Sequence, residues 1–377
     1  VTLAIIDDAM ETSHIDLQAN LLAVERCFDS DNAYCDSATS AAPAAPDQDH
    51  GTLVAGTAGA VGTNALGLAG AAWTVNILAL KIDLTTAAIA QAIAFAVAQG
   101  ADVINISLGG EFPSQVVRSA IENAGGAGVL VVTSAGNFDS NNDLGSLHFP
   151  SNFTTPNLIA VAASDRDDEI ATFSQFGRVS VDLAAPGVGI LTTGLNDDVN
   201  TFASGTSFST PLVAGVAALI KAETGVSGPD ADRLLRAYLL NAGVDGVAPG
   251  VGTTNFNAIP GRVATGRLDA RLALEGPAGG VVLLTNVDVD DTVPGNGNSE
   301  LDIGETAELV LTLENIWTSE SGITATLTAA NPARIAVTGP ATQSIGNLAE
   351  GASTTVRFPV ALLRPDCLNN CNESLLM

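Results

Sequence analysis

Three polar residues that are far apart in the sequence each stand at the edge of an apolar segment: Asp7, His50 and Ser207. A serine hydroxyl becomes a nucleophile when a base takes its proton. An imidazole serves best as that base when a carboxylate orients it and stabilises its protonated form. Each residue alone also has an ordinary structural explanation, as a strand-end turn former, a core histidine or a helix N-cap. Together the three predict nucleophilic catalysis on Ser207.

Ser207 lies where a loop of small and hydroxyl residues becomes a long run of Ala, Val, Leu and Gly at 212–220. The run is apolar on every face, which predicts a fully buried helix. A serine at the start of such a helix has the positive end of the helix dipole behind it and unpaired backbone N–H groups around it. That environment suits a nucleophile whose attack creates an oxyanion.

Further elements are needed to position these side chains. Residues 1–6 predict a buried strand that carries Asp7 at its C-terminal end, and residues 49–60 predict a small-residue helix with His50 in its first turn. The rest of this region alternates, with strands expected at 75–80, 103–107, 129–133 and 158–163 and helices at 85–99, 114–124 and 229–241. Such alternation predicts parallel βαβ crossovers with helices on both faces of one sheet. Residues 24–49 are expected to form a surface excursion.

The composition changes near the Gly- and Pro-rich segment 276–280, which predicts a linker. Beyond it, Thr-rich segments at 307–313, 324–328 and 354–360 alternate between apolar and polar residues, which is typical of an antiparallel β-sandwich. The expected fold is therefore an α/β domain at 1–276 with a mostly parallel sheet, followed by a small all-β sandwich domain at 277–377 that lacks its last strands.

Charge and cysteine content restrict the possible partners and compartments. The formal net charge of −27 argues against nucleic acid as a partner, because phosphate binding needs a basic surface. No apolar run is long enough to span a bilayer. Two local disulfides, Cys27–Cys35 and Cys367–Cys371, would fit a secreted protein, and free thiols are the alternative. We expect a secreted chain whose signal and pro-segment are absent from this sequence.

The segments around the three residues resemble the motifs of the subtilisin-like serine proteases (subtilases). The matching segments are Ala4-Ile5-Ile6-Asp7, 50–56 (HGTLVAG) and 205–211 (GTSFSTP). The resemblance covers about residues 1–275. It implies a subtilisin-like fold and a secreted endopeptidase that hydrolyses peptide bonds through an acyl-enzyme on Ser207. Its expected partners are protein or peptide substrates and its own pro-segment.

The resemblance also assigns roles to other residues. Asn137 would donate a hydrogen bond to the oxyanion, although a turn residue is its structural alternative. Segment 107–110 would pair with the substrate backbone and form one wall of the pocket for the residue before the scissile bond, with 134–136 as the other wall and Ser151 at the floor. The substrate-binding residues implied are Ser107, Leu108, Gly109, Gly110, Ser134, Ala135, Gly136 and Ser151.

One departure concerns the residues after Asp7. The family commonly has Ser or Thr followed by Gly there, whereas this chain has Asp8-Ala9, which is similar to the kexin-like proprotein convertases. Leu108-Gly109-Gly110 has the ordinary subtilisin form, so the basic-residue specificity of kexins is not implied.

Two loops resemble calcium sites, which would be structural. Asp16 and Asn64 match the family's strong site, with polar loop caps as the alternative. Loop 295–305 resembles calcium loops of sandwich domains appended to bacterial secreted proteases, with a solvated turn as the alternative. Its candidate ligands are Asn296, Asn298, Asp302 and Glu305.

A second hypothesis for function is a catalytically inactive subtilase scaffold that acts as a binding module through its C-terminal β-domain. The complete set of Asp7, His50, Ser207 and Asn137 argues against it.

Overall fold

The computed structural model describes residues 1–29, 41–42, 49–144, 147–244, 262–277, 279–292, 297, 304–329 and 335–363. The chain divides into two compact units, Val1–Gly276 and Pro277–Met377. Within the described ranges, no helix is both long and apolar enough to cross a membrane.

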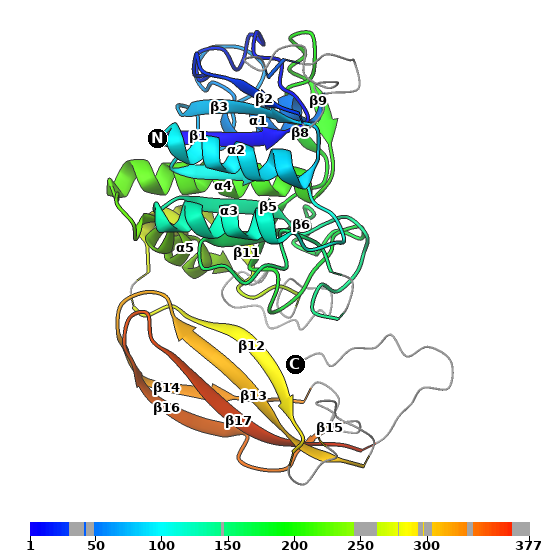
Figure 1. Cartoon of the computed structure of the whole chain (residues 1–377), viewed down its shortest axis with the longest axis vertical. Helices are drawn as coiled ribbons and strands as arrows, with labels where there is room; N and C mark the ends of the chain where they lie inside the picture. Colours follow the sequence, from blue (N-terminus) through cyan, green and yellow to red (C-terminus); the bar gives the residue numbers. More distant parts are fainter. Residues whose placement is uncertain are drawn as a thin grey trace. The chain divides into compact units, whose positions relative to one another are not determined.

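The first unit is organised around a sheet with the strand order β10-β11-β7-β6-β5-β4-β1-β3-β2 (Figure 1). All neighbouring strands from β11 to β2 are parallel, and β10 pairs antiparallel with β11. The strands are β1 (Thr2–Asp7), β2 (Arg26–Phe28), β3 (Asn76–Ile82), β4 (Val103–Ile106), β5 (Leu130–Ser134), β6 (Leu158–Ser164), β7 (Leu183–Pro186), β10 (Gly243–Val244) and β11 (Arg267–Leu268). A separate antiparallel hairpin joins β8 (Ile190–Thr192) to β9 (Thr201–Ala203).

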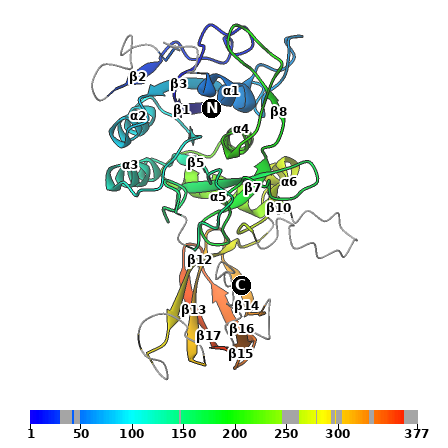
Figure 2. The same ribbon diagram turned by 90° about the vertical axis from the view of Figure 1, so that its right-hand side faces the viewer.

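Helices cover both faces of this sheet (Figure 2). One face carries α2 (Thr86–Ala98) and α3 (Gln115–Gly126), whose apolar side chains share a core with β1, β3, β4 and β5. The other carries α1 (His50–Gly59), α4 (Thr206–Thr224), α5 (Ala231–Asn241) and α6 (Ala270–Glu275). Parallel strands buried on both faces read as continuous apolar runs, and every residue of β4 and β5 is indeed buried.

The direction in which strands are added to the sheet reverses at β1. From β1 the chain passes through the edge strand β2 and then α1 to reach β3 on one side of β1. It then passes through α2 to reach β4 on the other side. At such a reversal of strand order, the loops at the carboxyl ends of the two central strands diverge and leave room for a ligand. Asp7 ends β1 and Ser107 follows β4, so both lie at this reversal of strand order.

The structure differs from the sequence prediction in part of the segment 24–49. Arg26–Phe28 forms β2, which pairs in parallel with the edge of the sheet at β3, whereas the sequence analysis placed it in a surface excursion. Three residues are too few for a periodic pattern, and the strand forms because its backbone completes the hydrogen bonds of β3. Cys27 in β2 is buried and disulfide-bonded. Cys35, Cys367 and Cys371 lie outside the described residues, so both pairings stay predictions.

The second unit is built from antiparallel strands, as the alternating segments predicted. One sheet has the order β12-β13-β17-β15, and β14 pairs with β16. Leu309, Val356, Phe358 and Val360 form its buried core, and Ala325 from β14 packs against them, so the two sheets share one apolar layer. The strands are β12 (Val282–Asp290), β13 (Thr306–Asn315), β14 (Glu320–Thr326), β15 (Ile335–Val337), β16 (Thr342–Leu348) and β17 (Ser353–Leu362).

Candidate active site

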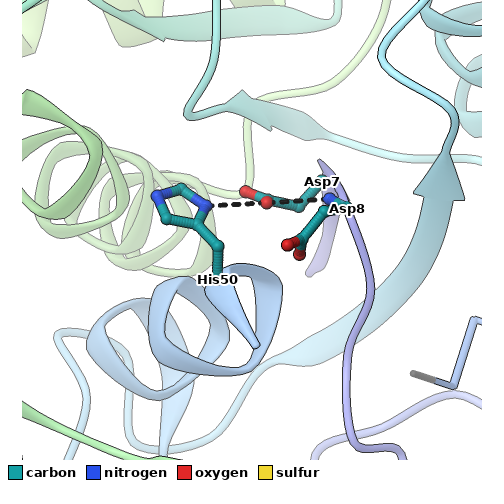
Figure 3. Close-up of side chains that lie close together, drawn as sticks. All are labelled: Asp7, Asp8 and His50. Carbon is teal, nitrogen blue, oxygen red and sulfur yellow. Dashed lines mark hydrogen bonds and ion pairs between the residues drawn. The ribbon is translucent and has the colours of Figure 1, made fainter. Parts of the chain in front are cut away.

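Asp7 and His50 form a hydrogen-bonded pair at the end of β1 (Figure 3). Nδ1 of His50 lies 2.7 Å from Oδ1 of Asp7, and the Asp8 backbone N–H donates to the same oxygen at 2.8 Å. The Asp7 side chain is almost fully buried, whereas the His50 side chain remains 34% exposed. A carboxylate on Nδ1 holds the proton there and leaves Nε2 as the atom that can take a proton from a nucleophile.

The first turn of α1 packs directly against the end of β1. This contact brings His50 to Asp7. Gly51 packs so closely that an added β-carbon would lie 2.9 Å from the Ala9 carbonyl carbon and 3.0 Å from Cβ of Asp7. The backbone N–H of Gly51 donates to Oδ1 of Asp8 at 2.9 Å. A glycine at this position therefore permits the contact on which the pair depends.

The electrostatics of this site favour a protonated imidazole. Burial opposes the charged form of His50, but the negative charges of Asp7, Asp8 and Asp49 outweigh it and raise the pKa of His50 to about 9. Burial, followed by the neighbouring charge of Asp7, raises the pKa of Asp8 to about 6. The neutral form of His50, which can act as a base, therefore becomes abundant only as the pH rises toward the alkaline range.

Ser207 lies in the first turn of α4 and is bound to the segment that follows β4. Its Oγ donates to the Ser107 carbonyl at 3.0 Å, and the Ser107 hydroxyl donates back to the Ser207 carbonyl at 2.9 Å. Pro211, four residues further on, has no N–H for that carbonyl, so the proline makes it available to Ser107. The Phe208 ring centroid lies 5.6 Å from that of His50. The start of α4 thus lies beside both the end of β4 and the imidazole.

Asn105 is a functional neighbour that the sequence analysis did not identify. Its side chain is completely buried within β4, and Nδ2 donates to the Ser107 hydroxyl at 2.9 Å. This bond orients the Ser107 hydroxyl toward the Ser207 carbonyl. The available signal was a polar residue inside the apolar strand Val103–Ile106.

Asn137 is held in the orientation that an oxyanion donor needs. Its Oδ1 accepts hydrogen bonds from the backbone N–H and the hydroxyl of Thr206, at 2.9 and 3.0 Å. Because the amide oxygen is used in this way, the NH₂ group is the part of the side chain that can serve a ligand. The side chain is exposed and lies beside Gly205, two residues before Ser207.

The two predicted pocket walls are also fixed by backbone contacts. Gly110 exchanges two hydrogen bonds with Phe149, at 2.9 and 2.7 Å. In the other wall, Ala135 accepts from Nδ2 of Asn142 at 3.0 Å and Gly136 accepts from the Gln175 N–H at 2.9 Å. Leu108 is half-buried against the core shared with α2 and α3, and Ser134 is buried at the end of β5.

The imidazole of His148 lies against both walls, at Gly109 and Gly136, and leaves no room for a β-carbon at either. Ser151, the predicted floor residue, is buried and donates to the His148 carbonyl at 2.7 Å, with its hydroxyl 3.0 Å from Nδ1 of the ring. Burial lowers the pKa of His148 to about 4, so the ring is neutral at neutral pH. Sequence analysis missed His148, whose only signal was its place directly before Phe149-Pro150-Ser151.

The structure brings Asp16 and Asn64 together. Asp16 is completely buried, and its Oδ1 accepts from Nδ2 of Asn64 at 2.6 Å. The Leu68 N–H lies 3.4 Å from the other Asp16 oxygen, and the Asn64 amide presents its NH₂ group, not its oxygen, to the carboxylate. A calcium ion, which binds oxygen atoms, would need this amide turned, so the calcium site stays a prediction. In the second loop, Asn296, Asn298 and Asp302 lie outside the described residues, and Glu305 directly precedes β13.

Comparisons with known proteins identify the family of this chain. The model of the subtilase family matches residues 1–259. Thermitase from Thermoactinomyces vulgaris is 35% identical over 228 residues, which are 59% of this chain and 75% of thermitase. Subtilisin Savinase from Lederbergia lenta is 38% identical over 179 residues, 46% of this chain and 62% of Savinase. The chain spans about half the length of several other curated relatives.

Two solved protease structures have a fold similar to that of this chain. A protease from Pseudoalteromonas arctica superposes with a TM-score of 0.60 at 28% identity, over 73% of this chain and 89% of that protein. A cold-adapted subtilisin-like serine proteinase superposes with a TM-score of 0.54 at 28% identity, over 71% of this chain and 89% of that protein. The family match, the relatives and the fold together show that this chain belongs to the subtilase family and is a serine endopeptidase.

Proposed function

We propose that Asp7, His50 and Ser207 form the catalytic triad of a secreted endopeptidase and that Asn137 completes its oxyanion hole. The observation that carries this proposal is the 2.7 Å contact between Asp7 and His50, beside a helix start that holds Ser207 and is bound by Asn137. An inactive scaffold would have no need for an Asp7–His50 pair, or for an Asn137 side chain bound to the start of the helix that carries Ser207.

The first half of the reaction is acylation. Rotation of the Ser207 side chain from the Ser107 carbonyl toward His50 lets Nε2 take the hydroxyl proton as Oγ bonds to the substrate carbonyl carbon. The negative charge that moves to the carbonyl oxygen is stabilised by Nδ2 of Asn137 and the Ser207 backbone N–H. Protonated His50 then gives its proton to the leaving amine, the peptide bond breaks, and an acyl-enzyme remains on Ser207.

The second half is deacylation by water. Neutral His50 takes a proton from water, and the oxygen attacks the acyl carbon through a second oxyanion in the same hole. Collapse of this intermediate returns the proton to Oγ of Ser207 and releases the new carboxyl end. Asp7 keeps its charge throughout and stabilises the imidazolium at both stages.

Substrate would bind as an extended peptide along the segment 107–110. The side chain before the scissile bond would enter between this segment and 134–136, with the neutral ring of His148 between the walls. The acidic composition and the cysteine pattern support secretion. Structural calcium at Asp16 and Asn64 would brace the loops that follow β1 and α1, which carry Asp7 and His50.

Replacing Ser207 by Ala should abolish peptide hydrolysis while leaving the melting temperature nearly unchanged, because only one hydroxyl is lost. His50→Ala should be about as damaging, and the double variant should lose little more, since the triad acts as a unit. The measurement is hydrolysis of a peptide library, with near-UV circular dichroism as the fold control. Turnover by Ser207→Ala well above background would assign the nucleophile elsewhere.

Asn137→Ala should lower kcat by roughly 10²–10³ with little change in KM, because the amide serves the transition state most. Steady-state kinetics on one peptide check this. Thr206→Val is the matched control, since it removes the hydroxyl that binds Asn137 but keeps the amide itself. Its loss in kcat should be clearly smaller. A change confined to KM in Asn137→Ala would instead make this residue a substrate-binding group.

Calcium should raise the melting temperature of Ser207→Ala, in which self-cleavage is suppressed, and EGTA should lower it. An ion that binds only the folded state stabilises that state by mass action. Asp16→Ala should remove most of this response if the first unit holds the ion, and Glu305→Ala should leave it intact. The reverse pattern would assign the ion to the second unit, and coincident curves with calcium and EGTA would exclude both sites.

A further inference from the structure

Asp8 is a half-buried carboxylate that the reaction above does not use, and it joins the two elements that carry Asp7 and His50. Its Oδ1 accepts from the backbone N–H groups of Ala9 at 2.5 Å and Gly51 at 2.9 Å. The N-cap residue of α1, Asp49, makes no side-chain capping bond. Asp8 therefore satisfies, from the neighbouring strand end, a helix N–H that an N-cap usually satisfies.

The hydrogen bond from Gly51 to Asp8 forms because the start of α1 packs against the backbone that follows β1. Gly51 lies directly against the backbone of Ala9 and against Cβ of Asp7. The bond from Gly51 to Asp8 therefore holds the first turn of α1 against the end of β1, where Nδ1 of His50 lies 2.7 Å from Asp7. A carboxylate at position 8 holds the imidazole in register with its partner.

The charge of Asp8 acts on the same imidazole. Oxygen and nitrogen atoms of Asp7, Asp8 and His50 lie within 4.8 Å of one another, and Figure 3 shows the Asp8 carboxyl below the Asp7–His50 pair. Among the described residues, the carboxylate of Asp49 also acts on His50, and the uncharged ring of Phe208 lies beside it. A second buried negative charge at this distance favours imidazolium over imidazole.

We propose that Asp8 is a positioning residue that anchors the first turn of α1 and, through its charge, confines the action of His50 as a base to alkaline solution. The proposal rests on the function proposed above for His50. It is supported by the pKa of Asp8, about 6, which leaves its carboxyl ionised where His50, with a pKa of about 9, titrates.

The sign of the effect follows from the charge. The base must be neutral, so kcat/KM rises as the pH passes upward through the pKa of His50. Removing the negative charge of Asp8 lowers that pKa, because imidazolium loses a stabilising neighbour. A variant without the charge should therefore reach its full activity at a lower pH than the parent enzyme.

The test is the pH profile of kcat/KM for Asp8→Asn, which keeps an oxygen that can accept from Gly51 but loses the charge. The acidic limb of this profile should lie about 1 pH unit lower than in the parent enzyme. At pH 7, kcat/KM should therefore be up to about ten-fold higher. Asp8→Ala should show the same displacement together with a lower kcat at every pH, because the anchor is lost as well. A profile of Asp8→Asn that superimposes on the parent profile would overturn the proposal.

Two control variants carry the same change in net charge. Asp49→Asn removes an exposed carboxylate next to His50 and should move the limb less than Asp8→Asn. Glu122→Gln removes an exposed carboxylate on α3, paired with Arg118, and should not move it. Equal displacements in Asp8→Asn and Glu122→Gln would show an effect of net charge alone and would contradict the proposed role.

An NMR titration separates this proposal from the triad assignment. The chain has only three histidines, so the ring C2–H signals can be followed in Ser207→Ala and assigned by loss of one signal in His50→Ala. Asp8→Asn should lower the pKa of His50 in this inactive background by about 1 unit. An unchanged pKa would refute the role of Asp8 while the triad stood. Retained hydrolysis by Ser207→Ala would refute the triad while the titration still tested Asp8.

Discussion

The hydrogen bond between Asp7 and His50 is the contact on which the rest of the site depends. It joins the end of the central strand β1 to the first residue of α1 at 2.7 Å. The bond therefore fixes the position of the start of this helix relative to β1. Carboxylate and imidazole are both held by backbone geometry, because Asp7 accepts from the Asp8 N–H and α1 begins at His50. The pair is therefore preorganised before any substrate arrives.

The serine side of the site is fixed by a different device, a reciprocal pair of hydrogen bonds between β4 and α4. Because Pro211 has no N–H, the Ser207 carbonyl lacks its usual donor within the helix. The Ser107 hydroxyl, which Asn105 orients, donates to this carbonyl instead. Asn137 adds a third link by accepting from the backbone and side chain of Thr206. The segments that follow β4 and β5 thus meet at the start of α4, at the edge of the sheet where parallel strands place their carboxyl ends together.

The local environment also explains why the pKa values of His50 and His148 shift in opposite directions. His50 is surrounded by the carboxylates of Asp7, Asp8 and Asp49, which outweigh the effect of burial and raise its pKa. His148 has no such neighbours among the groups that shift it, so burial alone lowers its pKa and keeps the ring neutral. One imidazole can therefore alternate between two protonation states at alkaline pH, while the other stays uncharged against Gly109 and Gly136.

Much of the fold could be predicted from the sequence, because strand and helix periods are local properties. The runs that became β1, β4, β5 and the middle of α4 are mostly apolar, as is typical of buried elements. The three-residue strand β2 was missed, since pairing with β3 creates it. The contacts of Asp8 with Gly51 and of His148 with Gly109 and Gly136 were also missed, because they arise from backbone approach between distant segments.

The most direct test of the account is to map the adduct formed by a fluorophosphonate, a probe that reacts with activated serine hydroxyls. Mass spectrometry of the digested chain should find one adduct, on Ser207, formed fastest at alkaline pH. Asp7→Asn should slow formation of the adduct by several orders of magnitude, because the imidazole loses the carboxylate that orients it and stabilises its protonated form. An adduct on another residue, or an unchanged rate in Asp7→Asn, would contradict the central role of the Asp7–His50 contact.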